Sequence, residues 1–249
     1  MLGKDHLLIA AILSIPLLFR AIDYIPSSFF IVLFIFVGIC IGSLLPDVDA
    51  PDAAINHPFI RGKHTGWSKY IAKLNPVVSK ITRIFMRPVA WIMKNQIKNL
   101  DTSHRGAFHS LQGISLLSIF WTTFTAIVCL IVLLILKMNI FILMAFPVGL
   151  FIGSVIHLLE DSFTARGITW NYPKHFTLRG NVKTMSEYKA KQEDLKWKEK
   201  ASFVLLYFLV TSIMIFLFVS SVWLTLLFLI IQIFLAFPIF SVKPHSNGS

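Results

Sequence analysis

The sequence contains few cysteines and few charged residues. Only two of its 249 residues are cysteines, and both Cys40 and Cys129 lie within apolar stretches. This placement excludes a disulfide-stapled fold and indicates two small buried side chains. Charged residues make up only 14% of the chain and hydrophobic residues 56%, a composition that excludes an ordinary soluble domain.

Long apolar stretches dominate the chain instead. Six of them are predicted to cross a membrane as helices, because about 20 apolar residues suffice to span a bilayer. They cover residues 6–21, 28–45, 109–136, 139–160, 202–219 and 222–239. The sequence therefore predicts an all-α, polytopic membrane bundle that forms a single domain over residues 1–240, followed by a flexible tail at residues 241–249.

Acidic residues are also scarce, with 12 Asp and Glu against 23 Lys and Arg. The predicted loops at residues 46–106 and 161–200 hold ten and nine of the cations, whereas the other side of the membrane keeps only Arg20 and Lys137. The positive-inside rule then assigns both loops and both chain ends to the cytoplasmic side of the inner membrane. Because topology explains the net charge of +11, a nucleic-acid partner is not expected.

Residues 68–98 within the first loop have the pattern of an amphipathic basic helix. Lysine and arginine recur there at spacings of three, four and seven, and apolar residues recur on another face. Pro76 and Pro88 are expected to interrupt this helix. It is predicted to lie in the membrane interface with its cations toward anionic lipid headgroups, or alternatively to pack only on the protein's own loops.

Ionisable residues near the ends of apolar spans indicate function by default. The residues in question are His6, Asp47, Asp49, His104, Arg105, His109, His157 and Asp161. His157 and Asp161 stand at i and i+4 on one helix face, whereas Glu160 is expected to point elsewhere. Each group alone also has a structural reading, such as a solvated helix end, a basic anchor or a buried His–Asp pair.

The predicted topology brings all of these groups to cytoplasmic ends of their spans, where helices of a bundle approach one another. Four histidines and three aspartates supply enough nitrogen and oxygen ligands for two or three divalent metal ions, with zinc favoured. Paired metals activate water and stabilise a leaving oxygen in hydrolysis. The sequence therefore predicts a cytoplasmic-face metal site that suits hydrolytic chemistry.

The same motifs carry a resemblance to a known family. "HLLIA" at His6, "LLPDVD" at Asp47 and Asp49, "HRGAFHSL" from His104, and "IHLLEDSFTARGITWNYP" from His157 occur in order over residues 6–173. In these motifs the chain resembles the YdjM-like family of predicted membrane-bound metal-dependent hydrolases. The resemblance implies metal ligation by the family's His and Asp positions: His6, Asp47, Asp49, His104, His109, His157 and Asp161. Arg105 matches the family's arginine.

A more remote similarity links this family to the zinc-dependent phospholipase C fold, which implies a phosphoester or phospholipid substrate. Three positions depart from the family pattern. Ala50 stands where a polar residue often follows the second aspartate, Phe108 where threonine often precedes the second histidine, and Arg166 where proline is common. Any of these departures could alter the substrate.

The expected function is hydrolysis at the cytoplasmic membrane surface, on an anionic lipid or another phosphoester substrate. Asp49 or Asp161 is predicted to act as a ligand or general base, and Arg105 to stabilise the anion. A His/Asp-lined transporter is an alternative, but only isolated polar residues such as Gln112 and Thr211 stand within the spans. A non-catalytic membrane adaptor with a structural metal is the other alternative. The sequence makes no prediction of oligomeric state.

Overall fold

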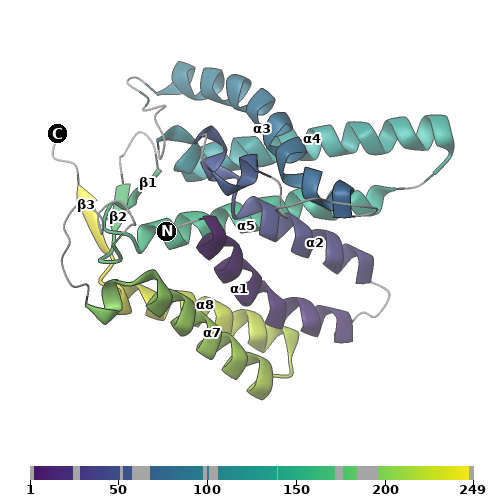
Figure 1. Ribbon diagram of the computed structural model, residues 1–249. Coiled ribbons are helices and arrows are strands. Elements are labelled where there is room, and N and C mark those ends of the chain that lie inside the picture. The colour runs from purple at the N-terminus through teal and green to yellow at the C-terminus, as the bar shows by residue number, and fades with distance from the viewer. Residues whose placement is uncertain are drawn as a thin grey trace.

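A computed structural model of the chain shows a bundle of helices with a small sheet at one end (Figure 1). It describes residues 3–24, 29–50, 53–57, 68–97, 100, 106–138, 140–171, 176–183 and 196–246. The helices within these residues are α1 (Gly3–Tyr24), α2 (Phe29–Gly42), α3 (Ser68–Gln96), α4 (Leu111–Leu136), α5 (Ala145–Ser162), α7 (Ala201–Phe218) and α8 (Val222–Ile239). The predicted all-α membrane class is confirmed.

Five helical segments of the described chain are long and apolar enough to cross a membrane. They are Gly3–Asp23, Leu111–Leu136, Phe141–Ser162, Ala201–Phe218 and Val222–Ile239. The remaining predicted span is occupied by α2, which has only 14 residues. At 1.5 Å per residue α2 is roughly 21 Å long, which is less than the roughly 30 Å thickness of the hydrocarbon core.

Helices α2 and α5 approach each other too closely for side chains at the contact. The contact is made by Gly38, Gly42, Gly149 and Gly153. A Cβ atom on Gly42 would overlap the carbonyl oxygen of Leu150, and the Ser154 hydroxyl donates a 3.1 Å hydrogen bond to the Gly42 carbonyl. Small residues four apart on both helices are typical of close packing in membranes. The contact fixes the end of α2, just before Asp47, against α5.

Helices α7 and α8 form a hairpin held by a buried polar group, the Gln232 cluster of Tyr207, Thr211, Ser212 and Gln232. The side-chain amide of Gln232 donates to the hydroxyls of Thr211 (2.6 Å) and Ser212 (3.3 Å). The Tyr207 hydroxyl donates to the Gln232 carbonyl at 2.8 Å. Thr211 is therefore not isolated, and its polar partners all belong to the α7–α8 pair in the described structure.

Arg20 joins the far end of α1 to α7. Its guanidinium donates to the carbonyl oxygens of Phe216 (2.8 Å) and Val219 (3.1 Å), which lie at the end of α7 where helix carbonyls lack partners of their own. The cation also lies 5.2 Å from the centre of the Phe216 ring. Arg20, one of the two cations predicted for the side of the membrane with few charges, thus caps the end of α7.

Helix α3 runs without the predicted interruptions, since Pro76 and Pro88 both lie inside it. One face is buried against α4, and the indole nitrogen of Trp121 donates to the Thr82 hydroxyl there (3.1 Å). The other face exposes Val77, Ile84 and Trp91 at seven-residue spacing, beside the exposed cations Lys80, Arg83, Arg87 and Lys94. The helix therefore packs on the protein and also presents an apolar and basic outer face.

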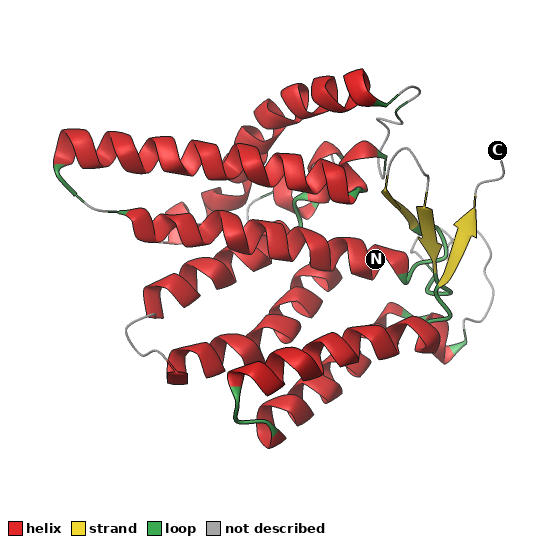
Figure 2. Cartoon of the chain, turned by 180° about the vertical axis from the view of Figure 1, so that it is seen from behind, coloured by secondary structure: helices red, strands yellow, loops and turns green. Residues whose placement is uncertain are grey.

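A three-stranded antiparallel sheet lies at the end of the bundle where α5 ends, as Figures 1 and 2 show. Its order is β1 (Ile168–Asn171), β2 (Phe176–Arg179) and β3 (Lys243–Ser246). Strand β3 belongs to the segment predicted as a flexible tail, so residues 243–246 differ from that prediction because they pair with β2. Residues 247–249 lie outside the described residues.

Candidate metal centre

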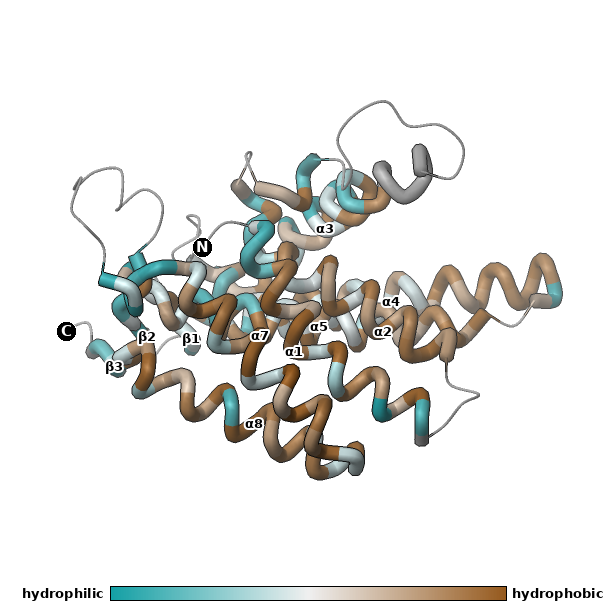
Figure 3. The backbone as a smooth tube through the Cα atoms, turned by 60° about the horizontal axis from the view of Figure 1, so that its bottom comes forward, coloured by the Kyte–Doolittle hydropathy of each residue, from teal (hydrophilic) through white to brown (hydrophobic). Residues whose placement is uncertain are grey.

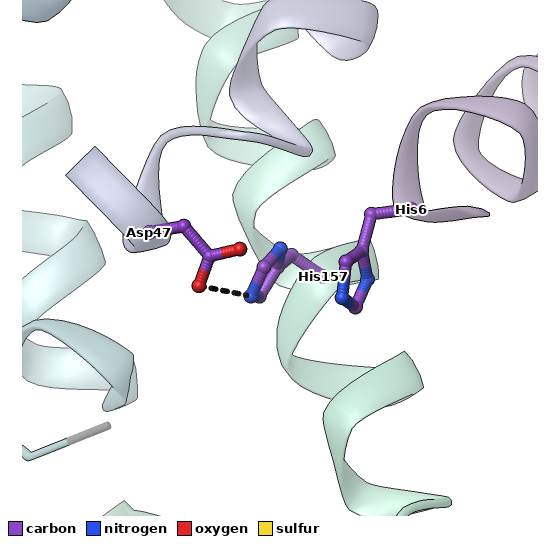
Figure 4. A group of neighbouring side chains, drawn as sticks. All are labelled: His6, Asp47 and His157. Atoms are coloured by element: carbon purple, nitrogen blue, oxygen red, sulfur yellow. Dashed lines mark ion pairs between the residues drawn. The ribbon is translucent and has the colours of Figure 1, made fainter. Parts of the chain in front are cut away.

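Five predicted metal ligands converge at one end of the bundle, where α1 begins and where α2 and α5 end. This is the polar end of the bundle. The five are His6, Asp47, His109, His157 and Asp161. Their donor atoms form two groups within 4.8 Å, namely His6, Asp47 and His157, and His109, His157 and Asp161. Figure 4 shows the first group, with the rings of His6 and His157 side by side and Asp47 pointing toward His157.

His157 occupies the centre of this cluster and is fully buried on α5. Its Nδ1–H donates a 2.7 Å hydrogen bond to the Ser43 carbonyl, which leaves Nε2 with an available lone pair. That nitrogen lies 3.5 Å from Asp161 Oδ2 and 3.7 Å from Asp47 Oδ1, and among the described residues it has no hydrogen-bond partner. A histidine oriented by a backbone carbonyl in this way is typical of metal ligands.

His6 reaches the cluster from the first turns of α1. Its Nδ1 donates to Glu160 Oε2 at 2.6 Å, its Nε2 lies 3.8 Å from Asp161 Oδ1, and its ring stacks on His157 with centroids 4.0 Å apart. The prediction that Glu160 points elsewhere is wrong, because position i+3 lies on the same helix face as i. The spacing of Glu160 from His157 was the signal that could have revealed it.

Asp47 and His109 complete the cluster from two short 3₁₀ helices, η2 (Pro46–Asp49) and η4 (Ala107–His109). Their Oδ1 and Nε2 atoms lie 3.1 Å apart. Burial favours a raised pKa for Asp47, but its interaction with His157 and its hydrogen bond with His109 outweigh burial and hold this pKa well below its usual range. Burial lowers the pKa of His109, which favours the neutral imidazole that binds metals.

The donor set fits a divalent transition metal. Donors held about 2.1 Å from one tetrahedral zinc lie about 3.4 Å apart, and the His–Asp contacts of the cluster range from 3.1 to 3.8 Å. Asp161 and Glu160 are both buried, and burying carboxylates is costly unless cations or donors compensate. Three imidazoles and two aspartates are also the nitrogen and oxygen ligands that zinc accepts.

One further predicted ligand that the structure describes, Asp49, lies outside this cluster. Asp49 ends η2, is half-buried, and belongs to neither group of converging donor atoms. His104 and Arg105 lie outside the described residues, so their predicted roles as ligand and anion contact remain predictions.

The turn that carries His109 differs from its prediction. The span predicted to begin at residue 109 begins instead at Leu111 as α4, and it is capped by Ser110, whose Oγ accepts from the Gly113 amide at 3.1 Å. Phe108 is buried among Val89, Met93 and Leu117. The departure at Phe108 is thus a core side chain that holds the turn against α3 and α4 while His109 contacts Asp47.

Arg83 is a cation near the cluster, on the helix that was predicted either to face lipid headgroups or to pack on the protein's own loops. From α3 its Nε donates to the Val48 carbonyl at 3.3 Å, between the two aspartates of η2. Helical periodicity placed Arg83 on a basic face, but no pattern in the sequence shows which loop that face overlies.

The fold and the apolar helices define a multi-pass helical membrane protein with a cluster of possible metal ligands at one end. The family model described as "YdjM inner membrane protein" matches residues 1–237. The chain therefore belongs to the YdjM inner membrane protein family. Searches of curated proteins and of solved structures found no significant match.

Proposed function

We propose that the protein is a membrane-bound metal-dependent hydrolase that cleaves a phosphoester in a phospholipid or a related anionic membrane substrate. The observation that carries this proposal is the imidazole of His157. It is buried in a cluster of carboxylates and oriented by Ser43, and its Nε2 has no hydrogen-bond partner among the described residues. A resident cation, for which zinc is the natural candidate, accounts for the gathering of three imidazoles and two aspartates around this nitrogen.

The ligand role of each histidine follows from which of its ring nitrogens is already hydrogen-bonded. His157 and His6 each use Nδ1 in a hydrogen bond, to Ser43 and Glu160, so each offers only Nε2 and serves one ion. With His109, Asp47 and Asp161 these donors suffice for one complete site. A second or third ion would require carboxylates shared between ions and further donors, for which Asp49 and His104 are the predicted candidates.

The two aspartates proposed as general base differ in their surroundings. Asp161 is fully buried within the cluster, which suits a ligand. Asp49 is half-buried at the edge of the same turn as Asp47, which suits a base that exchanges protons with water. When bound, a divalent ion supplies Lewis-acid activation of water and of the phosphoryl oxygen. Asp49 would accept a proton from water, and Asp161 would serve as a ligand.

The cations near the centre favour an anionic substrate. Arg83 contacts the η2 turn, and Arg105 is the predicted anion contact. The outer face of α3 combines exposed apolar and basic side chains, a combination typical of helices that lie on anionic membranes. With the positive-inside rule, these features support a polar end that faces the cytoplasm, with lipid headgroups drawn toward the cluster.

The proposal is tested by assaying purified full-length protein on vesicles that contain phosphatidic acid or phosphatidylglycerol, together with soluble phosphate monoesters and diesters. Asp49→Asn is expected to lower kcat by roughly 100-fold or more, as for loss of a general base, while the ion at His6, Asp47, His109, His157 and Asp161 is retained. Asp23→Asn, exposed beyond the cluster on α1, is the matched control and should leave kcat unchanged. Metal-loaded protein that cleaves none of these phosphoesters would contradict the proposal and favour an adaptor with a structural metal.

A further inference from the structure

A cavity of about 600 Å³ lies between α1, α2, α5 and α8. Aliphatic side chains from all four helices line it, including Leu17, Ile35, Val155 and Leu226. Figure 3 shows that these helices are hydrophobic over most of their length. The hydroxyl of Ser14, a lining residue, donates to the Ala11 carbonyl at 3.0 Å. The cavity is therefore suited to hydrocarbon rather than to a polar ligand.

The cavity and the cluster of candidate metal ligands follow each other along the same helices. On α1 the ligand His6 comes first and the cavity residues follow at 13–21. On α5 the cavity residues 151–159 come first, and the ligands His157 and Asp161 lie at the end of this stretch. On α2 the cavity residues 32–39 come before Asp47, which follows that helix. At 1.5 Å per residue, the cavity begins about 10 Å from His6 along α1 and extends about 12 Å further. All three helices thus order the cluster and the cavity in the same direction.

The cavity also reaches the protein surface. Its lining residues Ile152 on α5 and Ile230 on α8 are 38% and 43% exposed. These two helices are among the segments long and apolar enough to span the membrane. A lipid chain in the bilayer could therefore enter sideways between them.

We infer that this cavity binds one hydrocarbon chain of the substrate while the polar group of the same molecule lies at the metal cluster. The inference rests on the proposed function and narrows its substrate to an amphiphile with a phosphoester headgroup. Within a bilayer, lipid tails are as apolar as the cavity wall, so the hydrophobic effect adds little. The cavity instead orients the chain and thereby positions the headgroup.

The test uses the full-length protein in phosphatidylcholine nanodiscs that contain phosphatidic acid with a diazirine in one acyl chain. Irradiation and peptide mapping should place most crosslinks in residues 13–21 and 151–159. Val155→Trp and Leu226→Trp, which fill the cavity from two different helices, should each reduce these crosslinks several-fold. Ile131→Trp, on the exposed face of α4, is the matched control and should leave them unchanged.

Two results would overturn the inference. One is crosslinks spread evenly over the lipid-facing helices and unaffected by both cavity variants. The other is equal labelling by a diazirine phosphatidylcholine, which would mean that bulk lipid fills the cavity. Because crosslinking needs neither metal nor turnover, cavity labelling without any hydrolysis would refute the proposed function alone. If Val155→Trp and Leu226→Trp hydrolyse lipid at an unchanged rate, the inference that the cavity binds a substrate chain is refuted and the proposed function is not.

Discussion

Two polar clusters lie buried among the apolar helices, and they differ in kind. The Gln232 cluster joins two neighbouring helices through neutral amide and hydroxyl groups. The Gln232 amide nitrogen and the Tyr207 hydroxyl are hydrogen-bonded within it, and the neutral Gln232 Oε1 has no hydrogen-bond partner among the described residues. The His157 cluster draws ionisable side chains from four separate segments and leaves an imidazole nitrogen without a hydrogen bond among the described residues. Neutral polar groups suffice to bind helices together, whereas gathered carboxylates and imidazoles require another explanation.

The largest effect is expected where helix packing holds the ionisable cluster together. Gly153→Leu places a side chain against the carbonyl of Ile39 at the α2–α5 contact, where overpacking typically costs about 1–3 kcal/mol and sometimes more. A markedly lower melting temperature is expected for the detergent-solubilised protein. Ile152→Leu, one residue away and 38% exposed, should melt like the wild type. Normal melting of Gly153→Leu would contradict the close α2–α5 contact.

Glu160→Gln tests whether the carboxylate that orients His6 supports a metal ligand. Removing the negative charge weakens its 2.6 Å contact with Nδ1, and loss of such an outer partner lowers metal affinity by roughly 10–100-fold. Competition with a metal chelator measures this change. Glu199→Gln, half-buried on the η6 turn (Trp197–Glu199) and not one of the clustered donors, should bind metal as the wild type does. Unchanged affinity in Glu160→Gln would argue that His6 is not a ligand.

Gln232→Leu should have the smallest effect, because its cluster serves only to hold α7 against α8. Interhelical hydrogen bonds in membranes are worth about 0.6 kcal/mol on average, so a loss of stability of about 1 kcal/mol is expected from denaturant or thermal unfolding. Metal content should not change. Loss of bound metal in this variant would show that the two clusters are coupled and that the contrast between them is incorrect.

The sequence predicted the parts of the fold that depend on local pattern. Apolar length located the spanning helices, and the i, i+4 spacing of His157 and Asp161 put both on one face of α5. The same local view missed contacts that tertiary packing decides. Nothing near Ser43 in the sequence indicates that its carbonyl would orient His157. The apolar and basic residues that recur every seven positions in α3 do not indicate that this helix also packs on α4.

Some of what was missed had a signal in the sequence. Gly38 and Gly42, like Gly149 and Gly153, stand four residues apart, a spacing that predicts close helix contact in membranes. The sequence contains no signal that predicts strand β3, because this short polar segment forms a strand only when the loop that carries β2 folds beside it. Asp49 is the reverse case, since its closeness to Asp47 in sequence does not bring it into either group of donor atoms.

The central claim, that the His157 cluster holds a metal, is tested most directly by elemental analysis of the purified full-length protein. At least one equivalent of a divalent transition metal per chain is expected in the wild type. His157→Ala should lose most of it, and His245→Ala, exposed on β3, should retain it. A wild-type protein that folds normally, contains no metal, and takes up none when zinc is added would contradict the account.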